Sequence, residues 1–267
     1  MSVRTVARKD LADAGRSKAL WGVTLAIVLF TAGITGLVGV STDQPVGEVF
    51  GLAFQIVVFA LPIIALFLAK GALTGERESG SLRVLLSLPP SRGDILVGKF
   101  VGRTVLMLVA TLVGGVATGL VVVALLGGGL ELLVPFISFL GLMGVAFVAV
   151  GLGISAASAS DGRATAAAVT VYIVLVAMWD LIQVGVRAGG VELGLVEAGS
   201  NPAWLQFVGL LPPNQAANAA YEAATAGGRV LAADPFASVW LPSLVLLAWL
   251  VVPVAGGYLR FRTADIA

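Results

Sequence analysis

Long apolar stretches alternate with short polar connections along most of the chain. A helix needs about 20 apolar residues to cross a hydrocarbon core about 30 Å thick. The apolar residues run continuously within each stretch, whereas the strands of a membrane barrel would alternate apolar and polar positions; helices are the other structure that satisfies its backbone in lipid. We therefore predict an all-α polytopic membrane protein with six transmembrane helices, at 20–40, 52–69, 104–126, 135–157, 164–184 and 239–259.

The composition agrees with a membrane protein and excludes several kinds of site. Hydrophobic residues make up 58% of the 267 residues and charged residues only 12%, against about 25% charged in a soluble domain. Cysteine and histidine are both absent, which removes disulfides, thiolate sites and imidazole metal ligands. We expect no cofactor, no bound metal and no nucleic-acid partner.

The basic residues indicate which way the chain crosses the membrane. Fourteen of the sixteen Lys and Arg lie before the first span, in the loops after the second and fourth, or after the sixth, which leaves Arg187 and Arg229 for the other side. Cytoplasmic loops are the ones enriched in Lys and Arg. We therefore predict that both termini lie in the cytosol. We also expect the chain to span the plasma membrane.

The first 18 residues precede the first span and carry both charge and an apolar face. Val3, Val6, Ala7 and Leu11 recur at helical spacing among basic residues, which favours an amphipathic helix at the cytosolic interface. A solvated basic tail remains the alternative. A cleaved signal peptide is not favoured, because the following apolar stretch is longer than a typical signal core.

The cytosolic region 70–103, between the second and third spans, is the most informative part of the sequence. It begins with Glu76 and Glu78, continues into a leucine-rich stretch and reaches Pro89–Pro90. Leu82, Leu85 and Leu86 fall on one side of a helix by the i, i+3, i+4 rule. We predict a helix over Glu76–Leu88, continuous through 89–103 with the third span, that docks on a cytosolic partner.

Several catalytic classes are excluded by residues that the chain lacks. The stretch 93–100 resembles a P-loop, but Phe100 follows Lys99 where the motif needs Ser or Thr; Ser91 and Asp94 instead form a capping-box pattern. Serine and zinc proteases inside membranes need histidine. An aspartyl protease needs two carboxylates, and Asp180 is the one acid within a predicted span. We predict a chain without catalytic activity.

Asp180 and the nearby Gln183 form a candidate polar site at membrane depth. A buried ionisable residue in a span is a functional candidate by default. The alternative is an outer interfacial position beside Trp179, since tryptophans are enriched at that level. A single acid without an intramembrane partner also argues against a proton- or sodium-coupled transporter.

Two further features bear on architecture. The pairs Gly98/Gly102 and Gly115/Gly119 have the GxxxG spacing that lets helices approach closely, and we favour packing within one chain over a dimer seam. Residues 187–238 form the sizeable extracytoplasmic segment, with an alanine-rich run at 216–226 that suits a short helix. That segment is suited to gating an exit, to contacting an extracytoplasmic partner, or to serving as a plain cap.

Together these features resemble the membrane subunit of type-2 ABC exporters, near the NosY-like branch of permeases. The family motif is an acid-rich stretch followed by Leu-Leu-Ser-x-Pro, Ser-Arg and Gly-Lys. Its counterparts here are Glu76, Glu78, Gly80, Ser81, Leu82, Leu85, Leu86, Ser87, Pro89, Ser91, Arg92, Gly98 and Lys99.

The resemblance implies six spans, a cytosolic N-terminal helix and a coupling helix between spans two and three. It also implies an ABC ATPase subunit, which docks on Glu76, Glu78, Leu82, Leu85 and Leu86, and a second permease copy, identical or paralogous. The expected function is a permease that transmits ATPase motion across the membrane, for export or mechanical transmission. The alternative is a non-transport anchor or assembly factor that recruits a cytosolic partner.

Overall fold

The computed structural model describes residues 3–15, 18–80, 91–197, 199–226 and 234–263, and every regular element within them is helical. Five helices are long and apolar enough to cross a membrane, and a sixth candidate is a pair of helices joined at a bend. The prediction of an all-α polytopic protein is therefore confirmed.

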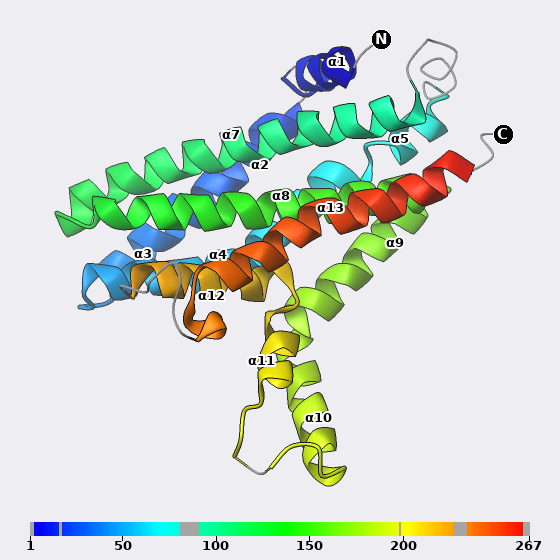
Figure 1. Cartoon of the computed structure of the whole chain (residues 1–267). Helices are drawn as coiled ribbons and strands as arrows, with labels where there is room; N and C mark the ends of the chain where they lie inside the picture. The colour runs from blue at the N-terminus through cyan, green and yellow to red at the C-terminus, as the bar shows by residue number, and fades with distance from the viewer. Residues whose placement is uncertain (1–2, 16–17, 81–90, 198, 227–233, 264–267) are drawn as a thin grey trace.

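Figure 1 labels the helices in chain order, and π-helical turns occupy Leu29–Gly33 and Ile173–Ala177. The helices are α1 (Val3–Gly15), α2 (Lys18–Val28), α3 (Ile34–Ser41), α4 (Val46–Lys70), α5 (Thr74–Glu78), α7 (Arg92–Leu126), α8 (Leu133–Ala157), α9 (Asp161–Tyr172), α10 (Trp179–Glu192), α11 (Ala203–Leu210), α12 (Pro213–Thr225) and α13 (Trp240–Thr263).

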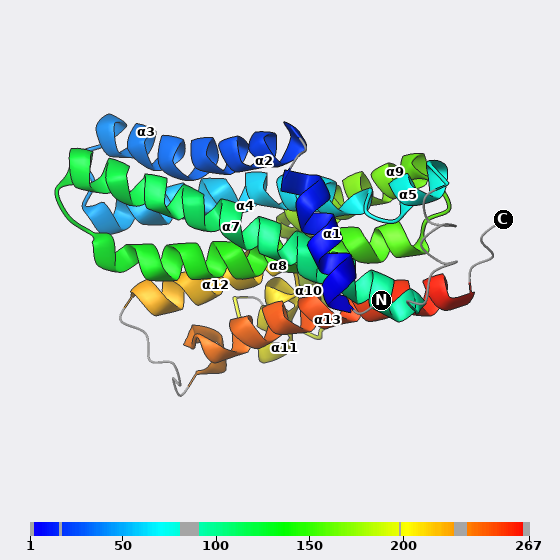
Figure 2. The same ribbon diagram turned by 90° about the horizontal axis from the view of Figure 1, so that it is seen from above.

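Helix α8 lies inside the bundle and packs against α4, α7, α12 and α13 (Figure 2). It is the most buried of the candidate spans. Its contact with α13 depends on glycine, because a Cβ added at Gly257 would lie 2.7 Å from the Cα of Gly153. Small residues at such crossings allow helix backbones to approach closely in lipid.

An aromatic cluster joins α12 to α4 and α8. The rings of Phe54 and Tyr221 stack with centroids 4.1 Å apart, and Phe136 meets both rings edge-on. Edge-to-face and offset aromatic pairs add stability beyond the area that they bury. The alanine-rich run thus forms the predicted short helix, and α12 packs into the core through Tyr221.

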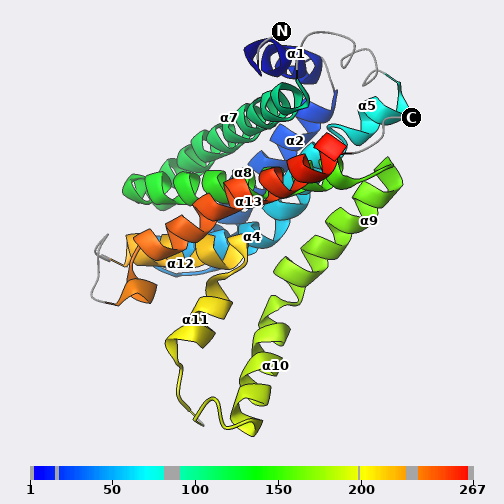
Figure 3. The same ribbon diagram turned by 45° about the vertical axis from the view of Figure 1, so that its right-hand side comes forward.

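Helices α1 and α5 and the last turns of α13 lie at one end of the bundle, which we call the terminal end (Figures 1 and 3). Helix α1 lies across α7 with Val6 buried. A Cβ added at Gly98 would lie 2.6 Å from the Cβ of Val6, and one at Gly102 would lie 2.7 Å from Asp10 Oδ2. The glycine pair therefore accommodates α1, which confirms packing within one chain.

The predicted span 164–184 includes a sharp bend. Helix α9 continues through the π-turn and meets α10 at Met178, where the two axes are inclined by 60°. Single π-turns often interrupt helices at functional positions. Beyond the bend, α10 and α11 pack together as an arm that projects from the bundle (Figure 3).

The prediction of a helix that starts at Glu76 and continues without a break into the third span is wrong. Helix α5 ends at Glu78, and Gly80 has φ = +74°, a left-handed conformation that helices do not contain. Helix α7 starts afresh at Arg92, where Ser91 and Asp94 form the predicted capping box. Leu82, Leu85 and Leu86 lie outside the described residues.

Candidate functional site

The junction between α4 and α5 is held against the C-terminal end of α8, just before the turn that joins α8 to α9. The buried hydroxyl of Ser155 accepts hydrogen bonds from the backbone N–H groups of Leu73 and Thr74, at 3.0 and 3.2 Å. These donors lie at the start of α5, where N–H groups have no partner within the helix. Ser155 thereby satisfies buried donors and fixes the direction in which α5 leaves the bundle.

Asp161, in the first turn of α9, connects to the same junction. Its carboxylate is 2.6 Å from Lys70 Nζ and accepts a hydrogen bond from the Thr74 hydroxyl at 3.1 Å. Its backbone N–H donates to Glu78 Oε1 at 2.7 Å, and Arg77 donates to the Ser158 carbonyl at 2.6 Å. Through these bonds α5 and the α8–α9 turn form one polar unit, which we call the junction network.

A second group of charges joins α1, α5 and α7. Lys99 Nζ lies 2.9 Å from Glu76 Oε1 and 3.7 Å from Asp10 Oδ1, and its side chain is only 5% exposed. Arg103 also reaches Asp10, with 3.1 Å from its Nε to Oδ2, and donates to the Leu68 carbonyl. Buried charges are tolerated when they are paired in this way. We call these four charged residues the clamp.

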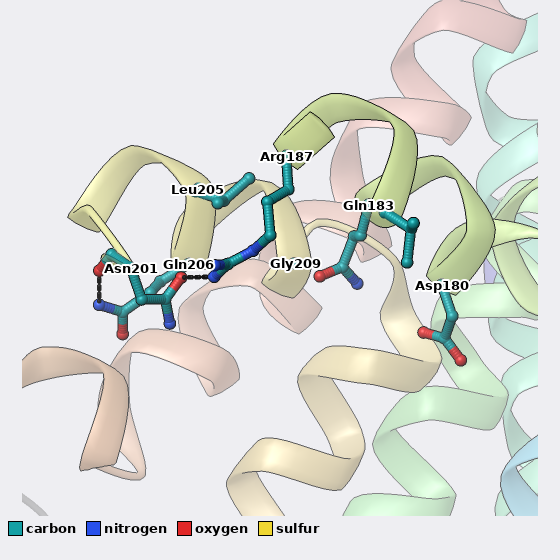
Figure 4. Close-up of a pocket in the computed structure, with 8 residues that line it drawn as sticks. Asp180, Gln183, Arg187, Asn201, Leu205, Gln206 and Gly209 are labelled. Atoms are coloured by element: carbon teal, nitrogen blue, oxygen red, sulfur yellow. Dashed lines mark hydrogen bonds between the residues drawn. The ribbon is translucent and has the colours of Figure 1, made fainter. Parts of the chain in front are cut away.

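A polar cavity of about 300 Å³ lies in the projecting arm, between α10 and α11 (Figure 4). Asp180, Gln183 and Arg187 line it from α10. Asn201 and Gln206 line it from the other side, where Gln206 donates to the Asn201 carbonyl at 2.8 Å. Such a polar cavity in a membrane chain is a candidate binding site.

An adjoining cavity of about 500 Å³ shares part of this wall and extends to α12. Gln215 of α12 donates to Asp180 Oδ1 at 2.7 Å, and Asn218 donates to Glu222 at 2.8 Å. The indole N–H of Trp179 donates to the Val208 carbonyl of α11 at 3.2 Å. The Trp179 bond joins α10 to α11 within the arm, and the Gln215 bond joins the arm to α12.

The sequence matches the family model described as "ABC-2 family transporter protein" over residues 4–266. The chain belongs to the ABC-2 family. It is 32% identical to the probable ABC transporter permease protein NosY of Pseudomonas aeruginosa and 31% identical to the protein of that name from Stutzerimonas stutzeri. Each alignment covers 97% of this chain and 98% of the relative. The resemblance to NosY-like permeases is thus confirmed, and the chain is a multi-pass membrane subunit of the ABC-2 type.

The predicted docking residues of this ABC-2 chain that the structure describes, Glu76 and Glu78, form bonds within the chain. Glu76 belongs to the clamp and Glu78 to the junction network. Asp180 and Gln183 both lie in the wall of the arm cavity. Their role in any activity stays a prediction.

The sequence reasoning missed the residues that hold α5 in place: Lys70, Ser155 and Asp161 in the junction network, and Asp10 and Lys99 in the clamp. Some signal was available, since Lys70 closes the second apolar stretch and Ser160–Asp161 opens the fifth. What was missing is the pairing, because Lys70 and Asp161 are far apart in sequence.

Proposed function

We propose that the chain is the permease subunit of an ATP-driven exporter, with both termini in the cytosol. In this arrangement an ABC ATPase subunit docks on segment 81–90 and its flanks, at the terminal end of the bundle, and a second permease copy completes the transporter. The observation that carries the proposal is the attachment of α5, which leads into that segment, to both the junction network and the clamp.

That double attachment supports a way of passing motion on to the spans. The junction network joins α5 to the α8–α9 turn, and the clamp joins it to α7 and α1. A displacement of segment 81–90 would therefore be passed to several helices. The sequence had suggested a single continuous helix for this role. Paired and buried contacts transmit such displacement because they have few alternative arrangements.

The docking proposal predicts that Leu85→Asp removes the ATPase from the complex. A charge placed in a desolvated protein contact typically costs a few kcal/mol, which is enough to abolish a transient assembly. The measurement is co-purification of the tagged permease from its native membrane, with mass spectrometry for a chain that carries a P-loop.

The matched control is Leu193→Asp, an exposed leucine just beyond the end of α10. It adds the same charge far from the terminal end and should leave the ATPase bound. An ATPase retained at wild-type levels by Leu85→Asp would refute docking on this segment. If no P-loop chain co-purified with the wild type, the non-transport anchor would be favoured instead.

The orientation predicts opposite labelling of two introduced cysteines. The chain has no cysteine of its own, and Ala159 and Ala226 are both exposed. Ala159→Cys, in the α8–α9 turn, should react with an impermeant maleimide only after the membrane is opened, whereas Ala226→Cys should react in intact cells. The reverse pattern would overturn the cytosolic placement of the termini.

A further inference from the structure

The arm cavity holds one acid and one base that do not neutralise each other. Asp180 Oδ1 accepts from the neutral amide of Gln215. Arg187 donates to two neutral acceptors, the Ser200 carbonyl and Asn201 Oδ1, both at 3.0 Å. Within the described ranges, no ion pair includes Asp180 or Arg187. Both charges line the same cavity, and each lacks a partner of opposite sign.

The contacts of Arg187 fix its orientation but occupy only some of its hydrogen-bond donors. A guanidinium has five N–H donors in a planar fork, and the two hydrogen bonds to Ser200 and Asn201 leave donors available while fixing the plane of the group. A fork of this kind matches the two oxygens of a carboxylate. Figure 4 shows Arg187 extending from α10 toward Asn201.

The separation of Asp180 and Arg187 along α10 indicates the length of a fitting ligand. Asp180 and Arg187 are seven residues apart on α10, so their Cα atoms are separated by about 10 Å along the axis at about 1.5 Å per residue. An extended peptide covers about 3.3–3.6 Å per residue. A chain of two or three residues therefore places its amine and its carboxylate at the two charges, whereas a single amino acid is too short.

The wall between the charges suits a peptide group. Gln183 lies between Asp180 and Arg187 on the same helix and lines the cavity with them (Figure 4). A Cβ added at Gly209 would lie 2.9 Å from Gln183 Oε1, so the glycine leaves room for this carboxamide. A carboxamide offers both a donor and an acceptor, which is what one peptide unit requires. Val184 and Leu205 supply apolar wall.

We propose that the arm cavity binds a zwitterionic peptide of two or three residues, with its amine at Asp180 and its carboxylate at Arg187. The Arg187 guanidinium at one end of the cavity would repel a polyamine, and the Asp180 carboxylate at the other end would repel a dianion. The proposal deepens the proposed transport function by naming a solute class, and it rests on that function for the role of the bound peptide. Binding itself needs no ATPase, so it is tested on the permease alone.

The experiment measures calorimetric binding of three probes to the full chain in nanodiscs of zwitterionic phosphatidylcholine. The probes are trialanine, N-acetyl-trialanine and trialanine amide. We expect saturable binding of trialanine, weakened about tenfold or more by blocking either end, because each block removes a hydrogen bond to a charged group. Absence of saturable trialanine binding, or equal binding of the blocked peptides, would overturn the proposal.

Variants assign each end of the peptide to its residue. Asp180→Asn should remove the preference for trialanine over its N-acetyl form, and Arg187→Gln should remove the preference over the amide. Because Arg187 also holds the arm, Arg187→Lys serves as the charge-retaining variant and should keep the preference for a free carboxylate. Glu192→Gln, on the same helix outside the cavity wall, should bind as the wild type does. Preferences that survive in Asp180→Asn and Arg187→Gln would contradict the assignment.

The outcome is separable from that of the proposed function. Loss of peptide binding with an intact ATPase complex would remove the solute class and leave the permease assignment standing. Peptide binding by a chain that never co-purifies with an ATPase would keep the cavity assignment and remove the transport role.

Discussion

Lys99→Met is expected to destabilise the protein by about 3–5 kcal/mol, because removing one partner of a buried ion pair leaves uncompensated charge. Lys99 lies between Glu76 and Asp10, and its side chain is 5% exposed. Methionine retains most of the apolar length but none of the charge. Arg103 still compensates Asp10, so the contact that is lost is the one between Lys99 of α7 and Glu76 of α5.

The measurement is thermal unfolding in detergent, followed by the fluorescence of the five tryptophans. We expect the midpoint to fall by roughly 10 °C, since 1 kcal/mol corresponds to about 2–4 °C in a domain of 150–250 residues. Lys9→Met, on the exposed side of α1, removes the same charge and should leave the midpoint unchanged. Equal midpoints for the two variants would show that the clamp does not stabilise the fold.

Gly257→Leu is expected to prevent the bundle from folding. A Cβ at this position would lie 2.7 Å from Gly153 Cα and 2.8 Å from its carbonyl oxygen. Backbone atoms of a packed helix have no rotamer to change, so α8 and α13 would have to separate. Overpacking typically costs about 1–3 kcal/mol where side chains can adjust, and here the obstacle is the backbone itself.

The preceding residue provides a matched control. Gly256 lies on the same helix, and a Cβ added there has no atom within 4 Å. Gly256→Leu should therefore be expressed and elute as a single species on size exclusion, whereas Gly257→Leu should aggregate or be degraded. A monodisperse Gly257→Leu protein would contradict the close crossing of α8 and α13.

Much of the bundle can be predicted from the sequence because few backbone structures satisfy their hydrogen bonds in lipid. A continuous apolar stretch of the right length has to be a helix, and the capping pattern at Ser91 and Asp94 marks the start of α7 correctly. The glycine pair at Gly98 and Gly102 also indicated a close contact within the chain. Each of these signals is local, and each is confirmed.

The features that failed depend on residues distant in sequence. The largely apolar stretch 164–184 did not indicate the bend at Met178, because a helix with a π-turn is as apolar as one without. Nor did the sequence indicate that Lys99 of α7 and the backbone of Asp161 in α9 bind Glu76 and Glu78, whose docking role stays a prediction. Hydropathy reports which residues avoid water but not which charges meet across a bundle.

Two anchors border the stretch 81–90. On one side the junction network holds α5. On the other, Ser91 caps α7, and Arg92 donates to the Phe261 carbonyl of α13 at 2.6 Å. Each of these bonds joins residues that lie outside 81–90. If the ATPase docks on 81–90 as proposed, the docking sequence is a cassette that is free to diverge among relatives while these bonds to the membrane bundle are kept.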